Sequence, residues 1–320
     1  MDWGEIKKGW CSKRDTFRIL SIDGGGIRGI FPAEYLANVE NEVATPIHEY
    51  FDLIVGTSTG GIIALAVSMG IPAKEIVRLY VEEGKRIFSS SLRLIPVRHI
   101  RMFIKSQYSN IHLQAQLKAT FKEAKMKDAN TMLCIPSIEH HKAMPKVFKT
   151  PHNGHLHIDQ DLYMWQVALA TSAAPFYFPP YSVEDNDCKL DGGLWANNPV
   201  IIGVAEAVRN GIRLEDIKVL SIGTGNNVYT AGRTAARINS LFSWRSNIID
   251  LAMNAQSEGY RFTAEYLLGN NHKRINTNLS KKVGLSSTSQ KSIGLLLHEA
   301  KTQFAQTFKN GPNIYQEFFL

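Results

Sequence analysis

The sequence contains a serine in a setting typical of a nucleophile. Residues 56–60 read GTSTG and fit the pattern G-x-S-x-G, in which the serine stands at a sharp turn between a strand and a helix. Glycines two residues on either side of Ser58 avoid Cβ atoms that would clash at such a turn. The N-terminus of the following helix favours developing negative charge. The pattern indicates acyl-transfer chemistry at Ser58. A small-residue turn that only packs a helix close to a strand is the structural alternative.

A run of three glycines, Gly24, Gly25 and Gly26, follows an expected strand and precedes an expected helix. Their backbone N–H groups can converge on an oxyanion because no side chain blocks its approach, and Arg28 adds a positive charge nearby. With Gly29, the same glycines also match the dinucleotide pattern G-x-G-x-x-G. That interpretation requires an acidic residue at the end of the next strand, whereas this strand runs directly into the serine turn. We therefore favour an oxyanion hole over a dinucleotide site.

A serine nucleophile needs a base within hydrogen-bond reach. Asp191 is followed by two glycines and can present its carboxylate from a tight turn, although Asp-Gly is also a common surface turn. The chain order Ser, acid, His of many hydrolases would leave His272 or His298 as the base, and neither has a distinctive setting. Five histidines between residues 140 and 157 lack metal-ligand spacing such as H-E-x-x-H. We therefore expect no metal and no cofactor.

The elements that must position these residues follow from hydrophobic periodicity. Strands are expected over residues 16–22, 51–55, 131–138, 146–150 and 219–222, and helices over residues 30–43, 62–68, 74–85, 111–125, 163–171, 246–268 and 292–308. The alternation of strand, glycine turn and helix predicts an α/β fold with a mainly parallel central sheet flanked by helices.

Taken together, the motifs resemble those of the patatin-like phospholipase family, which are serine lipid acyl hydrolases. Residues 23–29 resemble the family's glycine-rich oxyanion loop, residues 56–60 its nucleophile elbow and residues 191–193 its catalytic aspartate motif. Residues 170–179 and 220–225 resemble two further family segments. The resemblance covers residues 15–226 well and is weaker beyond them, where residues 274–276 resemble a family strand.

The resemblance implies a three-layer α/β/α fold and a Ser–Asp dyad that works without histidine. Ser58 would be the nucleophile and Asp191 the base, with the three glycines forming the oxyanion hole and Arg28 shaping or charging it. We predict a serine hydrolase that cleaves acyl esters of membrane phospholipids through an acyl-enzyme. The alternatives are a neutral-lipid lipase, a transacylase and a catalytically idle protein that senses a nucleotide.

Positive charge is concentrated in two parts of this chain of 320 residues, which has a net charge of +7. Residues 1–226 carry 25 basic and 24 acidic residues, whereas residues 227–320 carry 11 and 5; residues 85–127 hold ten basic residues and one acid. Anionic lipid, nucleotide or nucleic acid are the partners that such charge favours.

No linker divides the sequence, so we expect a single patatin-like domain over residues 1–320, with a motif-bearing core at residues 15–226 and a basic C-terminal part.

Two partners are predicted, a phospholipid membrane surface and a cyclic oligonucleotide activator. Residues 92–108 mix apolar and basic side chains, as an interfacial segment or a solvated surface helix does. Some compact bacterial members of the family are anti-phage effectors switched on by cyclic oligonucleotides, which need basic and stacking groups around phosphates. The candidate groups here are Arg98, His99, Arg101, Tyr229, Arg233 and Arg237.

Other sequence features indicate a cytoplasmic protein that is peripheral to the inner face of the membrane when active. The N-terminus has no signal-like apolar region, the three cysteines suggest no disulfide framework, and no apolar run has the length of a membrane span. No nucleic-acid polymer is expected, because no recognition motif accompanies the charge.

Overall fold

The computed structural model describes residues 14–89, 106–183, 187–227, 247–309 and 314–320, together with residues 6 and 10. Most of the expected interfacial segment lies outside the described residues. The six groups proposed to hold a cyclic oligonucleotide, from Arg98 to Arg237, also lie outside them.

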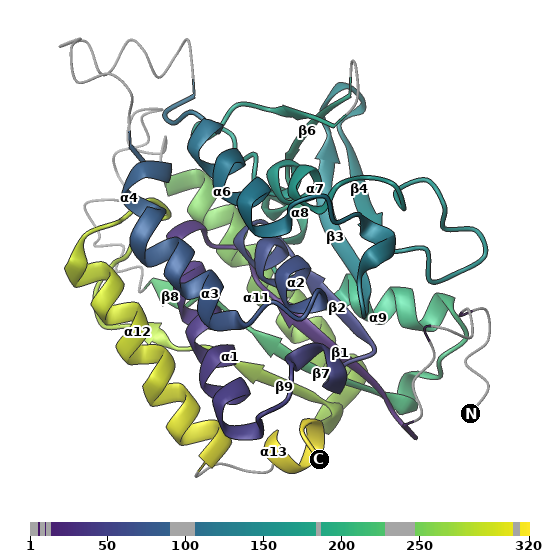
Figure 1. The fold of residues 1–320 in the computed structure, drawn as a ribbon. Coiled ribbons are helices and arrows are strands. Elements are labelled where there is room, and N and C mark those ends of the chain that lie inside the picture. The colour runs from purple at the N-terminus through teal and green to yellow at the C-terminus, as the bar shows by residue number, and fades with distance from the viewer. Residues whose placement is uncertain are drawn as a thin grey trace, which may run out of the picture.

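A twisted sheet runs through the centre of the molecule in the order β5-β6-β3-β2-β1-β7-β9, with β4 paired to β3 (Figure 1). Its strands are β1 (Phe17–Ile22), β2 (Leu53–Gly56), β3 (Met132–Glu139), β4 (Met144–Lys149), β5 (Tyr181–Ser182), β6 (Cys188–Asp191), β7 (Ile217–Ile222) and β9 (His272–Ile275). The run from β3 to β9 is parallel, whereas β4, β5 and β6 pair antiparallel. Two short strands, β8 (Asn226–Asn227) and β10 (Asn278–Leu279), pair with each other separately.

Alternating side chains divide the core into two clusters, one on each face of the sheet. In β1 and β2, Ile19 and Val55 join one cluster, while Leu20 and Ile54 join the other. Successive side chains of a strand point to opposite faces, so strands covered on both faces become continuously apolar. The sequence of β1, FRILSI, has this character and is buried almost throughout.

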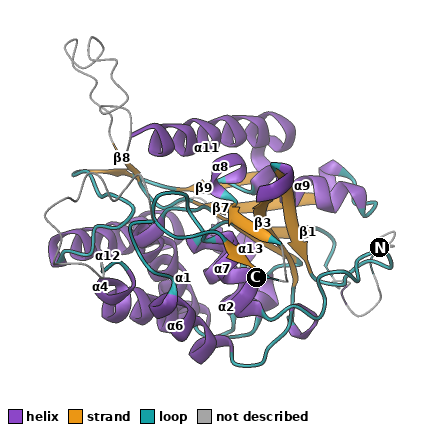
Figure 2. Cartoon of the chain, turned by 90° about the horizontal axis from the view of Figure 1, so that it is seen from above, coloured by secondary structure: helices purple, strands orange, loops and turns teal. Residues whose placement is uncertain are grey.

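Helices cover both faces, which gives three layers (Figure 2). The helices α9 (Val200–Arg209) and α11 (Asn247–Leu268) lie on one face with the short α8 (Gly193–Ala196). The larger layer on the other face contains α1 (Ile30–Val43), α2 (Thr59–Ser68), α3 (Ala73–Arg78), α4 (Gly84–Ile87), α6 (Ile111–Phe121), α7 (Met164–Thr171) and α12 (Gln290–Phe304). The final helix is α13 (Ile314–Phe318). The predicted α/β fold with a mainly parallel, helix-flanked sheet is confirmed.

Several expected elements differ in extent from those observed. The helix expected over residues 74–85 is interrupted by a π-helical turn, Leu79–Glu83, between α3 and α4. The helix expected to reach residue 125 ends at Phe121, because Lys122 takes a left-handed φ of 48°. His272 is the first residue of β9. The helix α9 and the strand β6 were not predicted.

The described helices include none that is both long enough and apolar enough to cross a bilayer.

Candidate active site

The strands β2 and β6 lie end to end along the same edge of β3. Cys134 of β3 pairs with Val55 of β2 and with Lys149 of β4, so β2 and β4 lie on opposite edges. Farther along, Ser137 pairs with Asp191 of β6 where β4 still occupies the other edge, so β6 shares an edge with β2. Since β2 is parallel and β6 antiparallel to β3, their carboxyl ends point toward each other. The turns that follow these two strands are therefore neighbours.

Ser58 occupies the turn after β2 with strained backbone angles, φ 54° and ψ −121°. Such a conformation costs roughly 1–3 kcal/mol in a residue with a side chain and persists only where the surroundings enforce it. Here the enforcing feature is close approach. A Cβ on Gly56 would lie 2.2 Å from the carbonyl oxygen of Gly60, and a Cβ on Gly60 would lie 2.3 Å from that of Ile22. Both glycines of the G-x-S-x-G pattern are thus required by the tightness of the turn.

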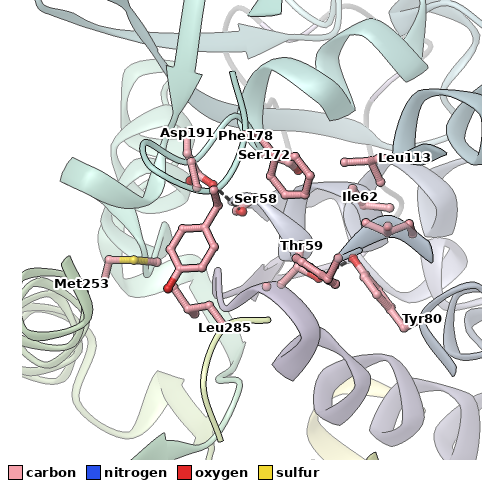
Figure 3. Close-up of a pocket in the computed structure, with 15 residues that line it drawn as sticks. Ser58, Thr59, Ile62, Tyr80, Leu113, Ser172, Phe178, Asp191, Met253 and Leu285 are labelled. Carbon is pink, nitrogen blue, oxygen red and sulfur yellow. Dashed lines mark hydrogen bonds between the residues drawn. The ribbon is translucent and has the colours of Figure 1, made fainter. Parts of the chain in front are cut away.

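The hydroxyl of Ser58 donates a hydrogen bond to the carboxylate of Asp191, with 2.6 Å between Oγ and Oδ2 (Figure 3). The other carboxylate oxygen, Oδ1, accepts the backbone N–H of Gly193 at 2.7 Å. Burial raises the pKa of Asp191 to about 6, and the two hydrogen bonds only partly offset this effect. Near neutral pH the carboxylate is therefore mostly ionised, yet its pKa is close enough for it to accept and return a proton.

Thr171, at the end of α7, fixes the backbone of the serine turn. Its hydroxyl accepts the Ser58 N–H at 2.9 Å and donates to the carbonyl oxygen of Pro136 at 2.6 Å. Pro136 lies in the stretch of β3 between the ends of β2 and β6. The threonine therefore connects the nucleophile turn to the strand that aligns both members of the pair.

The glycine loop leaves two backbone donors free. The N–H of Gly24 donates to the carbonyl oxygen of Asn197 at 2.9 Å. The N–H groups of Gly25 and Gly26 have no acceptor within the described part of the chain. Gly26 has a left-handed φ of 58° and faces the carbonyl of Leu285 so closely that a Cβ would lie 2.3 Å from its oxygen. The loop can thus offer the donors of Gly25 and Gly26 to an anion.

Arg28 follows the glycine run by two residues and is only 2% exposed. Its guanidinium donates to the carbonyl oxygen of Gly25 at 3.4 Å and to that of Gly225 at 3.2 Å. The side chain thereby ties the glycine loop to the segment after β7. Its positive charge also stabilises negative charge that develops near the glycine loop.

An apolar cavity opens onto the Ser58–Asp191 pair (Figure 3). Its other lining side chains are mainly apolar or aromatic: Ile62, Tyr80, Ile87, Phe88, Leu113, Tyr177, Phe178, Met253 and Leu285. The hydroxyl of Ser172, which also lines the cavity, is buried without a hydrogen-bond partner in the described structure. A cavity with this apolar lining suits an acyl chain whose ester carbonyl reaches Ser58.

Neither histidine considered as a base lines this cavity. His272 is on β9, where burial, followed by the charge of Arg274, lowers its pKa to about 4. His298 is on the exposed side of α12. Among the described residues, no cluster of histidine, cysteine, aspartate or glutamate has the arrangement of a metal site.

Comparisons with known proteins agree with this geometry. A family model described as patatin-like phospholipase matches residues 20–204. The chain is 33% identical over 262 residues to a cGAMP-activated phospholipase of Pseudomonas aeruginosa, an alignment that covers 81% of this chain and 78% of that protein. It is 35% identical over 236 residues to a cGAMP-activated phospholipase of Vibrio cholerae, covering 68% of this chain and 66% of that protein. It is 30% identical over 311 residues to patatin-like protein 4 of Arabidopsis thaliana, covering 82% and 77%.

A serine hydrolase site on a three-layer α/β/α fold defines the class, and the match to the family model defines the family. The chain belongs to the patatin-like phospholipase family. The predicted family, fold class and enzyme class are thereby confirmed.

Three residues that support the site had no predicted role. Thr171 and Asn197 hold the serine turn and the glycine loop, and Arg274 of β9 pairs with Asp23, directly before the loop. Thr171 lies within residues 170–179, which resemble a family segment, whereas Asn197 follows the aspartate motif by four residues. Their contacts join segments far apart in the chain, so local sequence patterns do not reveal them.

Proposed function

We propose that this protein hydrolyses acyl ester bonds of membrane phospholipids with Ser58 as nucleophile and Asp191 as base. The observation that carries the proposal is the 2.6 Å hydrogen bond from Ser58 Oγ to Asp191 Oδ2 at one end of an apolar cavity. Nucleophilic catalysis requires the base to contact the attacking hydroxyl, and this contact is already made.

In the first step, Ser58 Oγ attacks the ester carbonyl carbon while its proton passes to Asp191 Oδ2. The carbonyl oxygen becomes an oxyanion, which the N–H groups of Gly25 and Gly26 stabilise. The tetrahedral intermediate then collapses, the bond to the alcohol oxygen breaks, and that oxygen takes the proton from Asp191. The products are an acyl-enzyme and a lysophospholipid.

In the second step, a water molecule attacks the acyl carbon while Asp191 accepts its proton. Collapse of the second intermediate releases the fatty acid, and Ser58 Oγ regains a proton from Asp191. One carboxylate thus serves as base and acid in both halves of the reaction. This cycle needs no histidine.

We further propose activation by a cyclic oligonucleotide at a membrane surface. Two relatives that match most of this chain are cGAMP-activated phospholipases, which supports the activator. The basic balance of residues 85–127 and 227–320 supports both an anionic ligand and an anionic lipid surface.

The test measures fatty acid release from phospholipid vesicles, with and without cGAMP, by the wild-type protein, Ser58→Ala and Ser182→Ala. Ser182 is an exposed serine of β5 and serves as the matched control. We expect release that depends on cGAMP and Ser58 and is unaffected in the control. Equal release without a nucleotide would contradict activation only. Release by Ser58→Ala would contradict the nucleophile, and release from triglyceride emulsions alone would favour a neutral-lipid lipase.

A further inference from the structure

We propose that Arg274 is a positioning residue for the oxyanion loop, acting through Asp23. The inference rests on the proposed function, since it takes Gly25 and Gly26 as the oxyanion donors. Arg274 lies beyond residues 20–204, the part of the chain that the family model matches. The inference assigns a role in the reaction to the C-terminal part of the chain.

Asp23 is the last residue before the three glycines and is 3% exposed. Its backbone N–H donates to the carbonyl oxygen of Ile222 at 3.0 Å, so the residue is held against the end of β7. Burial raises the pKa of its carboxyl group, and the adjacent guanidinium of Arg274 opposes this effect. A buried carboxylate at this position requires a partner, because an isolated buried charge is strongly unfavourable.

Arg274 supplies that partner from two strands away. In the sheet, Ser21 of β1 is in register with Ser221 of β7, which is in register with Arg274 of β9. The guanidinium donates to the Ser221 hydroxyl at 2.7 Å and to Asp23 Oδ1 at 2.8 Å through Nη1, while Nη2 contacts Oδ2. A two-point contact fixes the orientation of the carboxylate as well as its charge.

Neighbouring residues of the C-terminal part hold the rest of the loop. Leu285 accepts the N–H of Ile27 through its carbonyl oxygen at 2.8 Å. Asn276 Oδ1 accepts the Gly225 N–H at 2.9 Å, and the carbonyl of Gly225 in turn accepts Arg28. The loop is thus held by segments that follow β9 as well as by β1.

The pair also has an electrostatic role. An unbalanced carboxylate at Asp23 would oppose the negative charge that develops beside Gly25 and Gly26 in the transition state. Arg274 removes that opposition without contacting the substrate. Loss of Arg274 should therefore reduce kcat more than it changes KM, since the oxyanion exists only in the transition state.

The experiment compares Arg274→Gln, Asp23→Asn and the double variant in the full chain, with a soluble nitrophenyl ester and, where required, the nucleotide activator. Arg261→Gln is the matched control. Arg261 lines the same polar pocket as Arg274 but pairs with Glu258 and Glu265. We expect Arg274→Gln to lower kcat by about 10²-fold with KM within about threefold, as expected for an impaired oxyanion hole, and the control to match the wild type.

The double variant distinguishes a specific effect of Arg274 on the oxyanion loop from a general loss of protein stability. Relative to Arg274→Gln, we expect kcat to rise to within about tenfold of the wild type, because the unbalanced carboxylate of the single variant is gone and the neutral Asn–Gln pair can still form a hydrogen bond. Wild-type kcat in Arg274→Gln, or losses that simply multiply in the double variant, would overturn the inference. If Arg274→Gln does not fold, Arg274→Lys replaces it. About a tenfold loss of kcat supports the inference, and an unchanged kcat overturns it.

The two proposals fail differently. A wild-type protein that hydrolyses no ester under any condition would contradict the proposed function. Normal hydrolysis by the wild type together with normal hydrolysis by Arg274→Gln would contradict only the role of Arg274.

Discussion

At the scale of single residues, the central feature is a buried carboxylate that accepts the serine hydroxyl directly. Asp191 has no histidine between itself and Ser58, and it makes its second hydrogen bond to the Gly193 N–H. In a Ser-His-Asp triad the histidine supplies a pKa near neutrality. Here burial brings the pKa of the aspartate itself to about 6. In the proposed mechanism, this desolvated acid performs the proton transfer that an imidazole performs in the triad.

The first prediction concerns the pH dependence of hydrolysis. Asp191 must be ionised to accept the proton of Ser58, so kcat/KM should fall about tenfold per pH unit below pH 6. The measurement is the rate on a soluble ester from pH 4.5 to 8, at constant ionic strength. A rate that stays constant down to pH 5 would show that Asp191 is not the base.

The second prediction concerns the stability cost of the same carboxylate. Its pKa rises from an ordinary value of 3.8 to about 6, which corresponds to ~3 kcal/mol. Since the folded state holds this proton more tightly than the unfolded state, stability decreases as the pH rises from 4 to 6. Asp191→Asn should be inactive but up to ~3 kcal/mol more stable than the wild type at pH 8, with no difference near pH 4. Urea unfolding at both pH values is the measurement, and equal stability at pH 8 would contradict the prediction.

At the scale of elements, the site depends on strands that end against one another. The edge of β3 holds β2 at Cys134 and β6 at Ser137, and the short interval between these positions brings the two following turns together. The helix α2 begins at Thr59, directly after Ser58, so its positive end lies beside the proposed nucleophile. The pair is therefore positioned by backbone pairing rather than by flexible loops.

The third prediction tests the tightness of the serine turn. A methyl group at position 56 would lie 2.2 Å from the carbonyl oxygen of Gly60. Gly56→Ala should therefore open the turn, abolish hydrolysis and lower the free energy of unfolding by ~2 kcal/mol or more. Gly294→Ala is the control, because a Cβ there meets no atom within 4 Å. Gly294 is an exposed residue of α12, so this control should gain up to ~1 kcal/mol with unchanged activity. Full activity in Gly56→Ala would contradict the argument.

At the scale of the whole molecule, one end of the central strands carries the candidate site and the other end packs against the C-terminal helix. The carboxyl ends of β1 and β2 carry the glycine loop and the serine turn. At the opposite end, α13 packs Phe318 against Phe51, and the carbonyl oxygen of Phe318 accepts the Arg18 guanidinium. We propose that the basic C-terminal part belongs to the same domain as the motifs, since β9 extends the main sheet.

The fourth prediction separates these two ends. Phe318 is fully buried, so Phe318→Ala should lower the free energy of unfolding by ~3–5 kcal/mol through the cavity it leaves. Because the site lies beyond the other end of the strands, kcat below the unfolding transition should not change. Leu320→Ala removes a side chain that is 70% exposed and should alter neither quantity. A large loss of kcat in folded Phe318→Ala would show that the two ends are coupled.

The sequence by itself determined the local features, whose residues are neighbours along the chain. Three such features are the elbow around Ser58, the glycine run before Arg28 and the tight turn at Asp191. In each, the residue types present indicate a particular local backbone conformation. Apolar periodicity likewise identified half of the described strands and most of the described helices, although the π-helical turn after α3 did not appear in it. These features depend on steric and hydrophobic preferences that act over a few residues.

Only the tertiary structure decided which of these groups meet. The contact of Ser58 with Asp191 joins residues 133 positions apart, and that of Asp23 with Arg274 joins residues 251 positions apart. Strand order and register along β3 and β7 bring them together. Burial in the assembled core then raises the pKa of Asp191. Neither property is encoded by neighbouring residues, because each arises when distant segments exclude water from the same space.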